Sequence, residues 1–155
     1  MAIVLPDVIN EKNMTLTLRA RAATGAIREI IGMLQANGEL GDSEKFIDEV
    51  IAREEASSTA TEHGTAFPHA RTDQVNRIAL GIGRSSGGIR FGKGAELVHL
   101  VFVIGVPRRM INDYLVCVGA LARIVRNDSA RAALLAAETP HEFAELLRSE
   151  SLLLE

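Results

Sequence analysis

Apolar and polar residues recur with two different periods, and the change of period predicts the order of strands and helices. Residues 14–18 alternate with a period of two, which predicts a half-buried strand. Apolar residues then recur at helical spacing over 27–34 and 46–51, which predicts two helices that cover a sheet. The second helix should begin at Asp42 or Ser43, because either side chain can accept a hydrogen bond from the first helical turn.

The middle of the chain predicts a loop followed by three strands. Residues 56–64 are rich in Ala, Ser, Thr, Glu and Gly, which is typical of a loop leading to a short strand at His69. Alternation over 76–83 predicts a second strand, closed by turn residues at 85–88. Residues 97–106 are apolar without alternation, which predicts a central strand covered on both faces.

Three helices should complete the chain. We expect Asn112 to cap the first of them and Asp128 to cap a short second one. Thr139, Pro140 and Glu142 form a full start signal for the last helix, with a capping hydroxyl, a proline in the first turn and an acidic side chain reaching back. The central strand needs helices on both sides, so this order predicts an α/β/α sandwich of three layers with a mixed central sheet.

Composition fits one domain over residues 1–155. A chain of 155 residues with 47% hydrophobic and 24% charged residues excludes collagen-like and disordered classes. The net charge of −3 provides no cationic field for phosphate polymers, so we expect no nucleic-acid partner. Cys117 is the single cysteine, so no internal disulfide or cysteine-based zinc cluster can form, and we expect a buried thiol in a reducing compartment.

No segment has the pattern of an export signal or a membrane span. Residues 1–13 lack a continuous apolar region. The longest apolar run, 97–106, is too short to cross a bilayer as a helix. We therefore expect a cytoplasmic protein that is not inserted in a membrane.

Histidine carries most of the candidate chemistry. His69 follows Pro68, which fixes the backbone and would hold the imidazole at a strand end facing a groove. His99 interrupts the apolar central strand, where it is either a hydrogen-bonded core residue or part of a site. His63 and His141 fit solvated positions in a loop and a first helical turn. A zinc site of His63, His69 and His99 remains an alternative, although their spacing matches no ligand motif.

Arg53 is the second candidate, because a guanidinium at the edge of a helical stripe needs an oxyanion or a carboxylate partner. Hydroxyl and backbone donors on the way to His69 could complete a small anion pocket; they belong to Ser57, Ser58, Thr59 and Gly64. The chain contains no GxxxxGK[ST] or HExxH sequence. We therefore expect neither a nucleotide cradle nor a bound cofactor or metal.

One stretch, Ala66-Phe67-Pro68-His69, resembles the AxPH motif of a bacterial family. The family comprises the enzyme IIA domains of the fructose/mannitol type in the phosphoenolpyruvate-dependent phosphotransferase system, including the nitrogen-regulatory IIA protein. Further pieces agree in order over nearly the whole chain: Arg53-Glu54-Glu55, the Ser/Thr loop, Gly64, Val98-His99-Leu100-Val101-Phe102, Pro107 and Tyr114-Leu115.

The resemblance implies an α/β/α sandwich that carries a phosphoryl group. It implies that His69 accepts phosphate from the phosphohistidine of HPr and passes it to a IIB domain, which phosphorylates a sugar during uptake. His99 would be the neighbouring histidine that steadies the phosphoryl group, and Arg53 the cation near it. The chain departs from the family's usual pattern at Thr61-Glu62-His63 and at Arg71.

Two other functions remain open. A regulatory protein of the nitrogen type would use phosphorylation of His69 to switch contacts with target proteins, and a chain without a fused IIB or IIC segment favours that function. The departures around His63 also permit a degenerate or metal-binding module.

Overall fold

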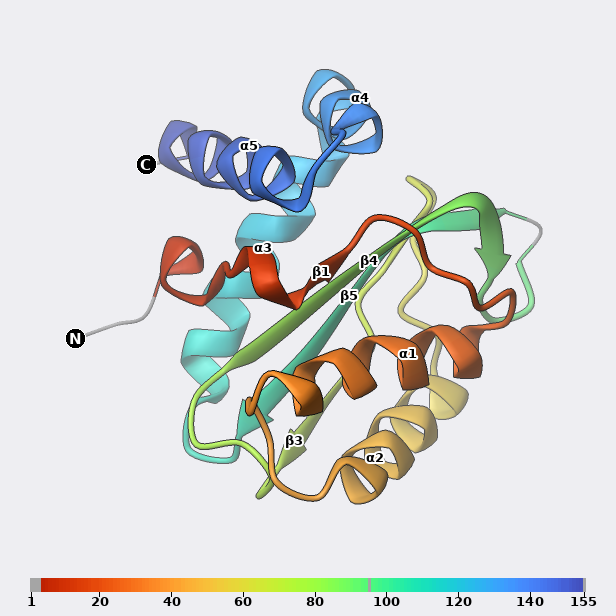
Figure 1. Ribbon diagram of the computed structural model, residues 1–155, viewed down its shortest axis with the longest axis vertical. Coiled ribbons are helices and arrows are strands. Elements are labelled where there is room, and N and C mark those ends of the chain that lie inside the picture. The colour runs from red at the N-terminus through yellow and green to blue at the C-terminus, as the bar shows by residue number, and fades with distance from the viewer. Residues whose placement is uncertain (1–3, 95, 155) are drawn as a thin grey trace.

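A mixed sheet of five strands forms the centre of the computed structural model, which describes residues 4–94 and 96–154. The strands are β1 (Met14–Thr15), β2 (Thr65–Ala66), β3 (His69–Thr72), β4 (Ala79–Arg90) and β5 (Leu97–Pro107). The strand order is β1-β4-β5-β2, and β3 also pairs with β5. Strands β4 and β5 are antiparallel (Figure 1). The three short strands run parallel to the long strand that each one pairs with.

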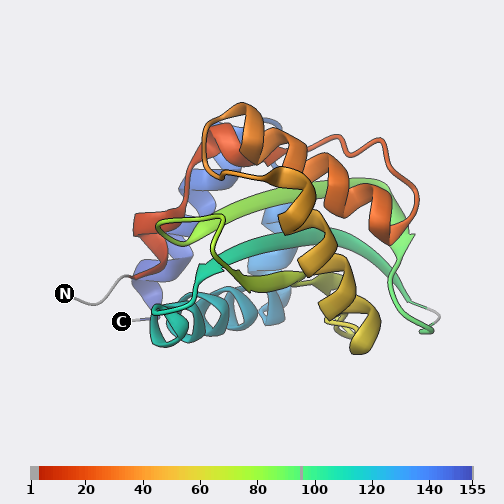
Figure 2. The ribbon, with the colours of Figure 1, turned by 90° about the horizontal axis from the view of Figure 1, so that it is seen from below.

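Helices cover both faces of the sheet. Helices α1 (Ala23–Ala36) and α2 (Ser43–Ala56) pack on one face. The other face carries α3 (Ile111–Arg126), α4 (Asp128–Ala136) and α5 (Pro140–Leu153). Figure 2 shows α1 and α2 on one side of the sheet and the C-terminal helices on the other. Two short 3-10 helices, Leu5–Val8 and Glu11–Asn13, precede β1. This arrangement confirms the predicted α/β/α fold class.

Strand β5 is buried on both faces, as its uninterrupted apolar sequence predicts. Val101 and Val103 point toward α1 and α2, whereas Phe102 and Ile104 point toward the C-terminal helices. Each of these four side chains is at most 1% exposed. Burial of one such side chain stabilises the fold by about 1.5–3 kcal/mol. Because its side chains alternate between the two faces, β5 contributes to both hydrophobic cores.

Two predicted strand boundaries are wrong. The first strand contains only Met14 and Thr15, although the backbone N–H of Leu18 still donates to the carbonyl of Arg84. The turn predicted at 85–88 lies inside β4, which continues to Arg90 after a register shift. Glycine in a strand can mark an irregularity as well as a turn, so composition alone could not distinguish the two.

Two predicted helix caps are also wrong. Helix α3 begins at Ile111 after Met110, so Asn112 lies inside its first turn. Asn127 rather than Asp128 caps α4, because its Oδ1 atom accepts a hydrogen bond from the Ala130 N–H at 2.9 Å. The caps predicted for α2 and α5 are confirmed at Asp42 and Thr139.

Candidate active site

Strands β2 and β3 form one edge of the sheet that is interrupted at Phe67 and Pro68. Strand β2 pairs with Leu100 and Val101, and β3 begins with His69 opposite Ile104. Proline has no N–H for the ladder, but its carbonyl still accepts a hydrogen bond from the Ile104 N–H at 2.9 Å. This interruption places His69 at the first position of an edge strand, on the face that α3 covers.

The His69 imidazole is fixed on two sides. Its Nδ1 atom lies 2.9 Å from the carbonyl oxygen of Phe67. A carbonyl only accepts, so Nδ1 carries the hydrogen, and Nε2 of the neutral ring has a free lone pair. The ring also stacks against Tyr114, with centroids 5.0 Å apart and an interplanar angle of 29°. Within residues 4–94 and 96–154, Nε2 is therefore the ring nitrogen without a hydrogen-bond partner.

A buried carboxylate supports the backbone that orients this ring. Glu54 is 9% exposed, and both of its oxygens accept hydrogen bonds from Thr59. The Thr59 hydroxyl oxygen in turn accepts from the Phe67 N–H at 2.9 Å. Glu54 and Thr59 thereby fix Phe67, whose carbonyl binds His69.

Arg53 lies in the last turn of α2, beside the same cavity. Its Nη1 atom donates to the Ser57 carbonyl at 2.8 Å, which satisfies an acceptor at the helix C-terminus. A guanidinium has five N–H donors, so this contact leaves others available to an anion. Arg53 is thus a fixed cation next to the imidazole.

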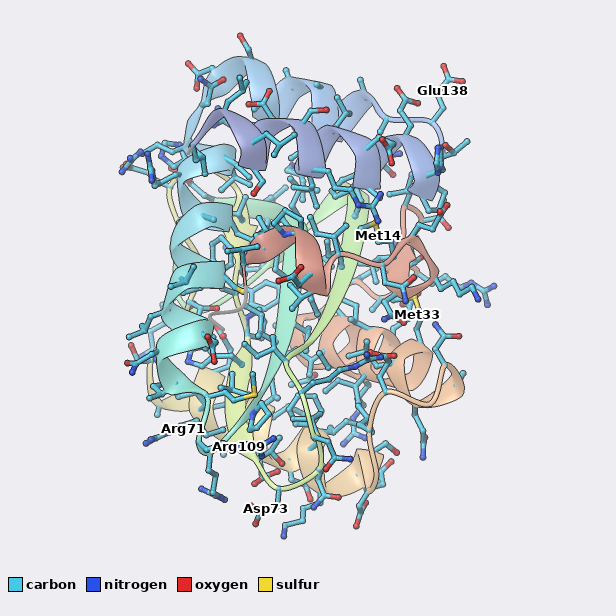
Figure 3. All side chains as sticks on the ribbon, turned by 90° about the vertical axis from the view of Figure 1, so that its left-hand side faces the viewer. Met14, Met33, Arg71, Asp73, Arg109 and Glu138 are labelled. Atoms are coloured by element: carbon cyan, nitrogen blue, oxygen red, sulfur yellow. The ribbon has the colours of Figure 1, made fainter. Side chains whose placement is uncertain are left out.

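The cavity at His69 has a volume of about 620 Å³ and a cationic rim. Two further arginines, Arg71 and Arg108, line it together with Arg53. Arg108 pairs with Asp73 at 3.0 Å, whereas no hydrogen bond or ion pair joins the Arg71 side chain to any residue within 4–94 or 96–154. Figure 3 shows Arg71 and Arg109 at the same end of the molecule as Asp73. The remaining lining residues are Glu49, His69, Ala70, Val106, Ile111 and Tyr114.

The surroundings of His69 favour its neutral form. Burial lowers its pKa from 6.5, and the nearby charge of Arg53 lowers it further, against the raising effects of the Phe67 hydrogen bond and Glu54. At neutral pH the ring is therefore unprotonated at Nε2. An exposed lone pair on Nε2 beside a fixed guanidinium suits nucleophilic attack on an electrophile that carries negative charge.

His99 does not lie beside His69, and this expectation is wrong. It precedes Ile104, the partner of His69, by five residues on β5, which is about 16 Å along a strand. Its Nδ1 atom donates to the Ser85 carbonyl at 2.9 Å, and the ring lines a separate cavity with Arg84. The reason is that β3 pairs with the later half of β5. Tyr114 occupies the place expected for a second ring.

The predicted donors of an anion pocket are also mostly elsewhere. Ser57 and Ser58 line another cavity, and the Gly64 carbonyl accepts from the backbone N–H groups of His99 and Leu100. Thr59 supports the site through Glu54 and Phe67, and the Ser57 carbonyl holds Arg53.

The remaining two histidines do not line the cavity, and each lies near a carboxylate. His63 lies 3.8 Å from Glu62 and His141 lies 3.2 Å from Glu11. Within residues 4–94 and 96–154, no three His, Cys, Asp or Glu side chains are grouped as a metal site would need.

The sequence patterns did not reveal Tyr114 and Glu54 as site residues. Tyr114 lies on the buried face of α3, where an aromatic residue is typical of core packing. Glu54 follows Arg53 in the sequence, and such a position is typical of an exposed charged side chain. The available signal was the family resemblance, because its matching segments include both Arg53-Glu54-Glu55 and Tyr114-Leu115.

Comparison with known proteins decides the family. Residues 7–150 match the family described as phosphoenolpyruvate-dependent sugar phosphotransferase system, EIIA 2. The chain belongs to this family. Membership confirms the resemblance, and with it the prediction of a phosphoryl-carrying phosphotransferase component.

Two relatives of this EIIA chain are fructose-specific. It is 30% identical over 124 residues to the fructose-specific EIIA component of Haloferax volcanii, covering 79% of this chain and 80% of that protein. It is 26% identical over 144 residues to the fructose-specific EIIABC component of Bacillus subtilis. The match covers 92% of this chain but only 23% of the Bacillus protein.

Solved structures share the fold of the EIIA chain. The nitrogen regulatory protein IIA-Ntr of Neisseria meningitidis is 19% identical with a TM-score of 0.79, over 92% of this chain and 97% of that one. The IIA mannitol component of Escherichia coli, solved in complex with phosphorylated IIB, is 21% identical with a TM-score of 0.78, over 90% of this chain and 96% of that one.

No helix within the described residues is long and apolar enough to span a bilayer.

Proposed function

We propose that His69 of the EIIA chain receives a phosphoryl group on Nε2 from the phosphohistidine of an HPr-like protein and passes it to a IIB domain. The observation that carries this proposal is the hydrogen bond from His69 Nδ1 to the Phe67 carbonyl. It leaves Nε2 as the nucleophilic atom, and Nε2 belongs to a ring that lines an open cavity beside Arg53.

The proposed step needs no separate base. The lone pair of Nε2 attacks phosphorus, a new P–N bond forms, and the P–N bond to the donor imidazole breaks with its electron pair returning to the donor. The His69 ring keeps its Nδ1 hydrogen and becomes a phosphorylated imidazolium. In the second transfer, the nucleophile of IIB attacks phosphorus, and the P–N bond to His69 breaks with its electron pair returning to Nε2.

Charged groups around the ring suit both partners of this reaction. The guanidinium of Arg53 offers charge-assisted hydrogen bonds to phosphoryl oxygens. The Phe67 carbonyl and the nearby Glu54 carboxylate stabilise the positive charge that the ring gains, since both raise the pKa of His69 against the larger effect of burial. Positioning and charge stabilisation are the main requirements of phosphoryl transfer.

Sugar uptake is the better supported setting for this carrier. The relative with 30% identity is a fructose-specific EIIA component of nearly the same extent. The IIA mannitol structure comes from a complex with phosphorylated IIB, which supports a IIB acceptor. Among these comparisons, the regulatory alternative has the shared fold of IIA-Ntr at 19% identity. We therefore infer that the chain serves transport of a sugar through HPr-like and IIB partners.

Incubation with phosphoenolpyruvate, enzyme I and HPr tests the carrier directly. Intact-mass measurement should show one added phosphoryl group on the native chain and none on His69→Ala. The exposed His141 provides a matched control, so His141→Gln should be phosphorylated like the native chain. His99→Gln should also be phosphorylated, because His99 lies in a different cavity. A native chain that gains no phosphate overturns the proposal.

Two further readouts test the atom and the acceptor. Phosphorus–proton correlation spectra should show phosphorus bonded to Nε2, and a bond to Nδ1 would contradict the tautomer argument. Loss of the phosphoryl group to a sugar-specific IIB domain supports transport. Binding to a kinase or channel that depends on phosphorylation, without transfer to IIB, would replace transport by regulation.

A further inference from the structure

Tyr114 occupies the space beside the phosphoryl acceptor. It lies one turn into α3, its side chain is held in the core that faces the C-terminal helices, and only 8% of it is exposed. Its ring lies against the His69 imidazole at a centroid distance of 5.0 Å. Both rings line the same cavity, so any group bound to His69 Nε2 lies next to Tyr114.

The phenol hydroxyl of Tyr114 is available to a ligand. Among residues 4–94 and 96–154, no group forms a hydrogen bond with it. A buried tyrosine hydroxyl ordinarily finds a partner, and Tyr114 is one of the residues that line the cavity at His69. Burial raises the pKa of Tyr114, against a lowering by the Arg53 charge, so the hydroxyl keeps its proton at neutral pH. The same guanidinium acts on His69, which places both rings within its electrostatic reach.

We propose that Tyr114 is a catalytic residue of the EIIA chain, whose ring holds the His69 imidazole and whose hydroxyl donates a hydrogen bond to the transferring phosphoryl group. This inference rests on His69 being the acceptor. In this proposal the Tyr114 hydroxyl donates the second hydrogen bond to the phosphoryl group, a role that the sequence analysis expected of His99. Arg53 and Tyr114 would then contact phosphoryl oxygens from two elements, α2 and α3.

The phenol takes no part in the exchange of bonds. Its O–H stays intact while the P–N bond to the donor breaks and the P–N bond to Nε2 forms. It lowers the barrier only as far as its hydrogen bond strengthens when charge builds on the oxygens. A phenol also keeps one protonation state throughout the neutral range, in contrast to an imidazole. Its contribution should therefore be constant between about pH 6 and pH 9.

The decisive comparison is between the native chain and Tyr114→Phe, which removes one oxygen and keeps the ring. Rapid-quench measurements of transfer from phospho-HPr should show a rate about tenfold lower in the variant, the effect of one hydrogen bond. The deficit should be the same from about pH 6 to pH 9, because no group that titrates there has been removed. Equal rates in the two proteins would overturn the role of the hydroxyl.

A second variant tests the role of the ring and guards against misfolding. Tyr114→Leu should shift the NMR signals of the His69 ring carbons and their protons through loss of the neighbouring aromatic ring, and Tyr114→Phe should leave them nearly in place. Unchanged His69 signals in Tyr114→Leu would overturn the stacking. A matched urea-unfolding curve for Tyr114→Phe excludes a loss of fold as the cause of slower transfer.

The two proposals fail in different ways. If the native chain takes up no phosphoryl group, the acceptor role of His69 is wrong. If the native chain and Tyr114→Phe take it up at the same rate, only the role of the Tyr114 hydroxyl is wrong.

Discussion

Thr59 and Glu54 are joined by two hydrogen bonds: the Thr59 hydroxyl donates to Oε1 at 2.7 Å and the Thr59 N–H donates to Oε2 at 2.8 Å. One residue of the loop thus satisfies both oxygens of a buried carboxylate on α2. The same hydroxyl accepts from the Phe67 N–H, so the pair also fixes the residue that orients His69. Thr59 therefore couples the loop over 56–64 to the segment Phe67-Pro68-His69.

Thr59→Val should destabilise the protein by about 1–3 kcal/mol, because it leaves one oxygen of buried Glu54 and the Phe67 N–H without their partner. Valine keeps the shape of the side chain, so the effect reports the hydroxyl alone. Thr59→Ser retains the hydroxyl and is the matched control, which should lie much closer to the native chain. Urea-induced equilibrium unfolding measures all three, and equal values for the Val and Ser variants would contradict the coupling.

Arg53→Gln should raise the pKa of His69. Burial is the main cause that lowers this pKa, and the Arg53 charge is the next lowering cause, so burial remains while the charge is lost. An NMR titration of the His69 ring protons measures the shift. The transfer rate from phospho-HPr should fall by about tenfold to 10²-fold, since a charged donor near the phosphoryl oxygens is lost.

Arg28 provides a control for the loss of one positive charge. It is exposed on α1 and pairs with Glu44, so Arg28→Gln should leave the His69 pKa unchanged. A His69 pKa that falls in Arg53→Gln, or rises equally in both variants, would show that Arg53 is not the neighbouring cation.

Local patterns predicted the elements well because burial follows periodicity. The alternation over 76–83 and the apolar run over 97–106 correspond to the two long strands, and the helical stripes correspond to α1 and α2. The effect of Pro68 on the chain was also predictable, and it places His69 at a strand end. That residues 1–155 form a single domain stays a prediction.

The membership of the site was harder to predict, because it depends on pairing between distant segments. The interruption at Phe67 and Pro68 determines which part of β5 lies beside His69. The sequence of β5 itself contains no pattern that predicts this register. The position of His99 on the central strand is confirmed, but its expected place beside His69 is wrong, because His69 pairs with Ile104 further along β5. Tyr114 and Glu54 look like core and surface residues along the chain. Tertiary packing brings Tyr114 against the imidazole and Glu54 into the hydrogen bonds with Thr59 that support Phe67.

Cys117 should react slowly with alkylating reagents in the folded protein. Cys117 lies on the buried face of α3 and is 1% exposed. Burial, with contributions from Asp113 and Asp7, raises the pKa of its thiol to about 11. The thiolate is the reactive form, so both access and ionisation are limited. Mass spectrometry after iodoacetamide treatment should show little labelling at about pH 8 and complete labelling in concentrated urea. Comparable rates under both conditions would contradict the burial.

The lowered pKa of His69 makes part of the folding stability depend on pH. Burial, and then the Arg53 charge, disfavour the protonated ring in the folded protein, whereas the unfolded chain protonates near its ordinary pKa of 6.5. Below that pH the unfolded state binds more protons than the folded state, so the free energy of unfolding falls as pH falls through the folded pKa. Above it, both states are neutral and the contribution is constant.

His69→Gln removes this titration and keeps a polar side chain of similar reach. The difference in unfolding free energy between the native chain and the variant should stay constant above about pH 7 and move against the native chain toward about pH 5. Urea unfolding at a series of pH values measures it, and the other histidines cancel because both proteins contain them. A difference that is the same at every pH, or that moves in favour of the native chain in acid, would mean that the folded protein does not disfavour the protonated His69 ring and that its neutrality at the site needs another cause.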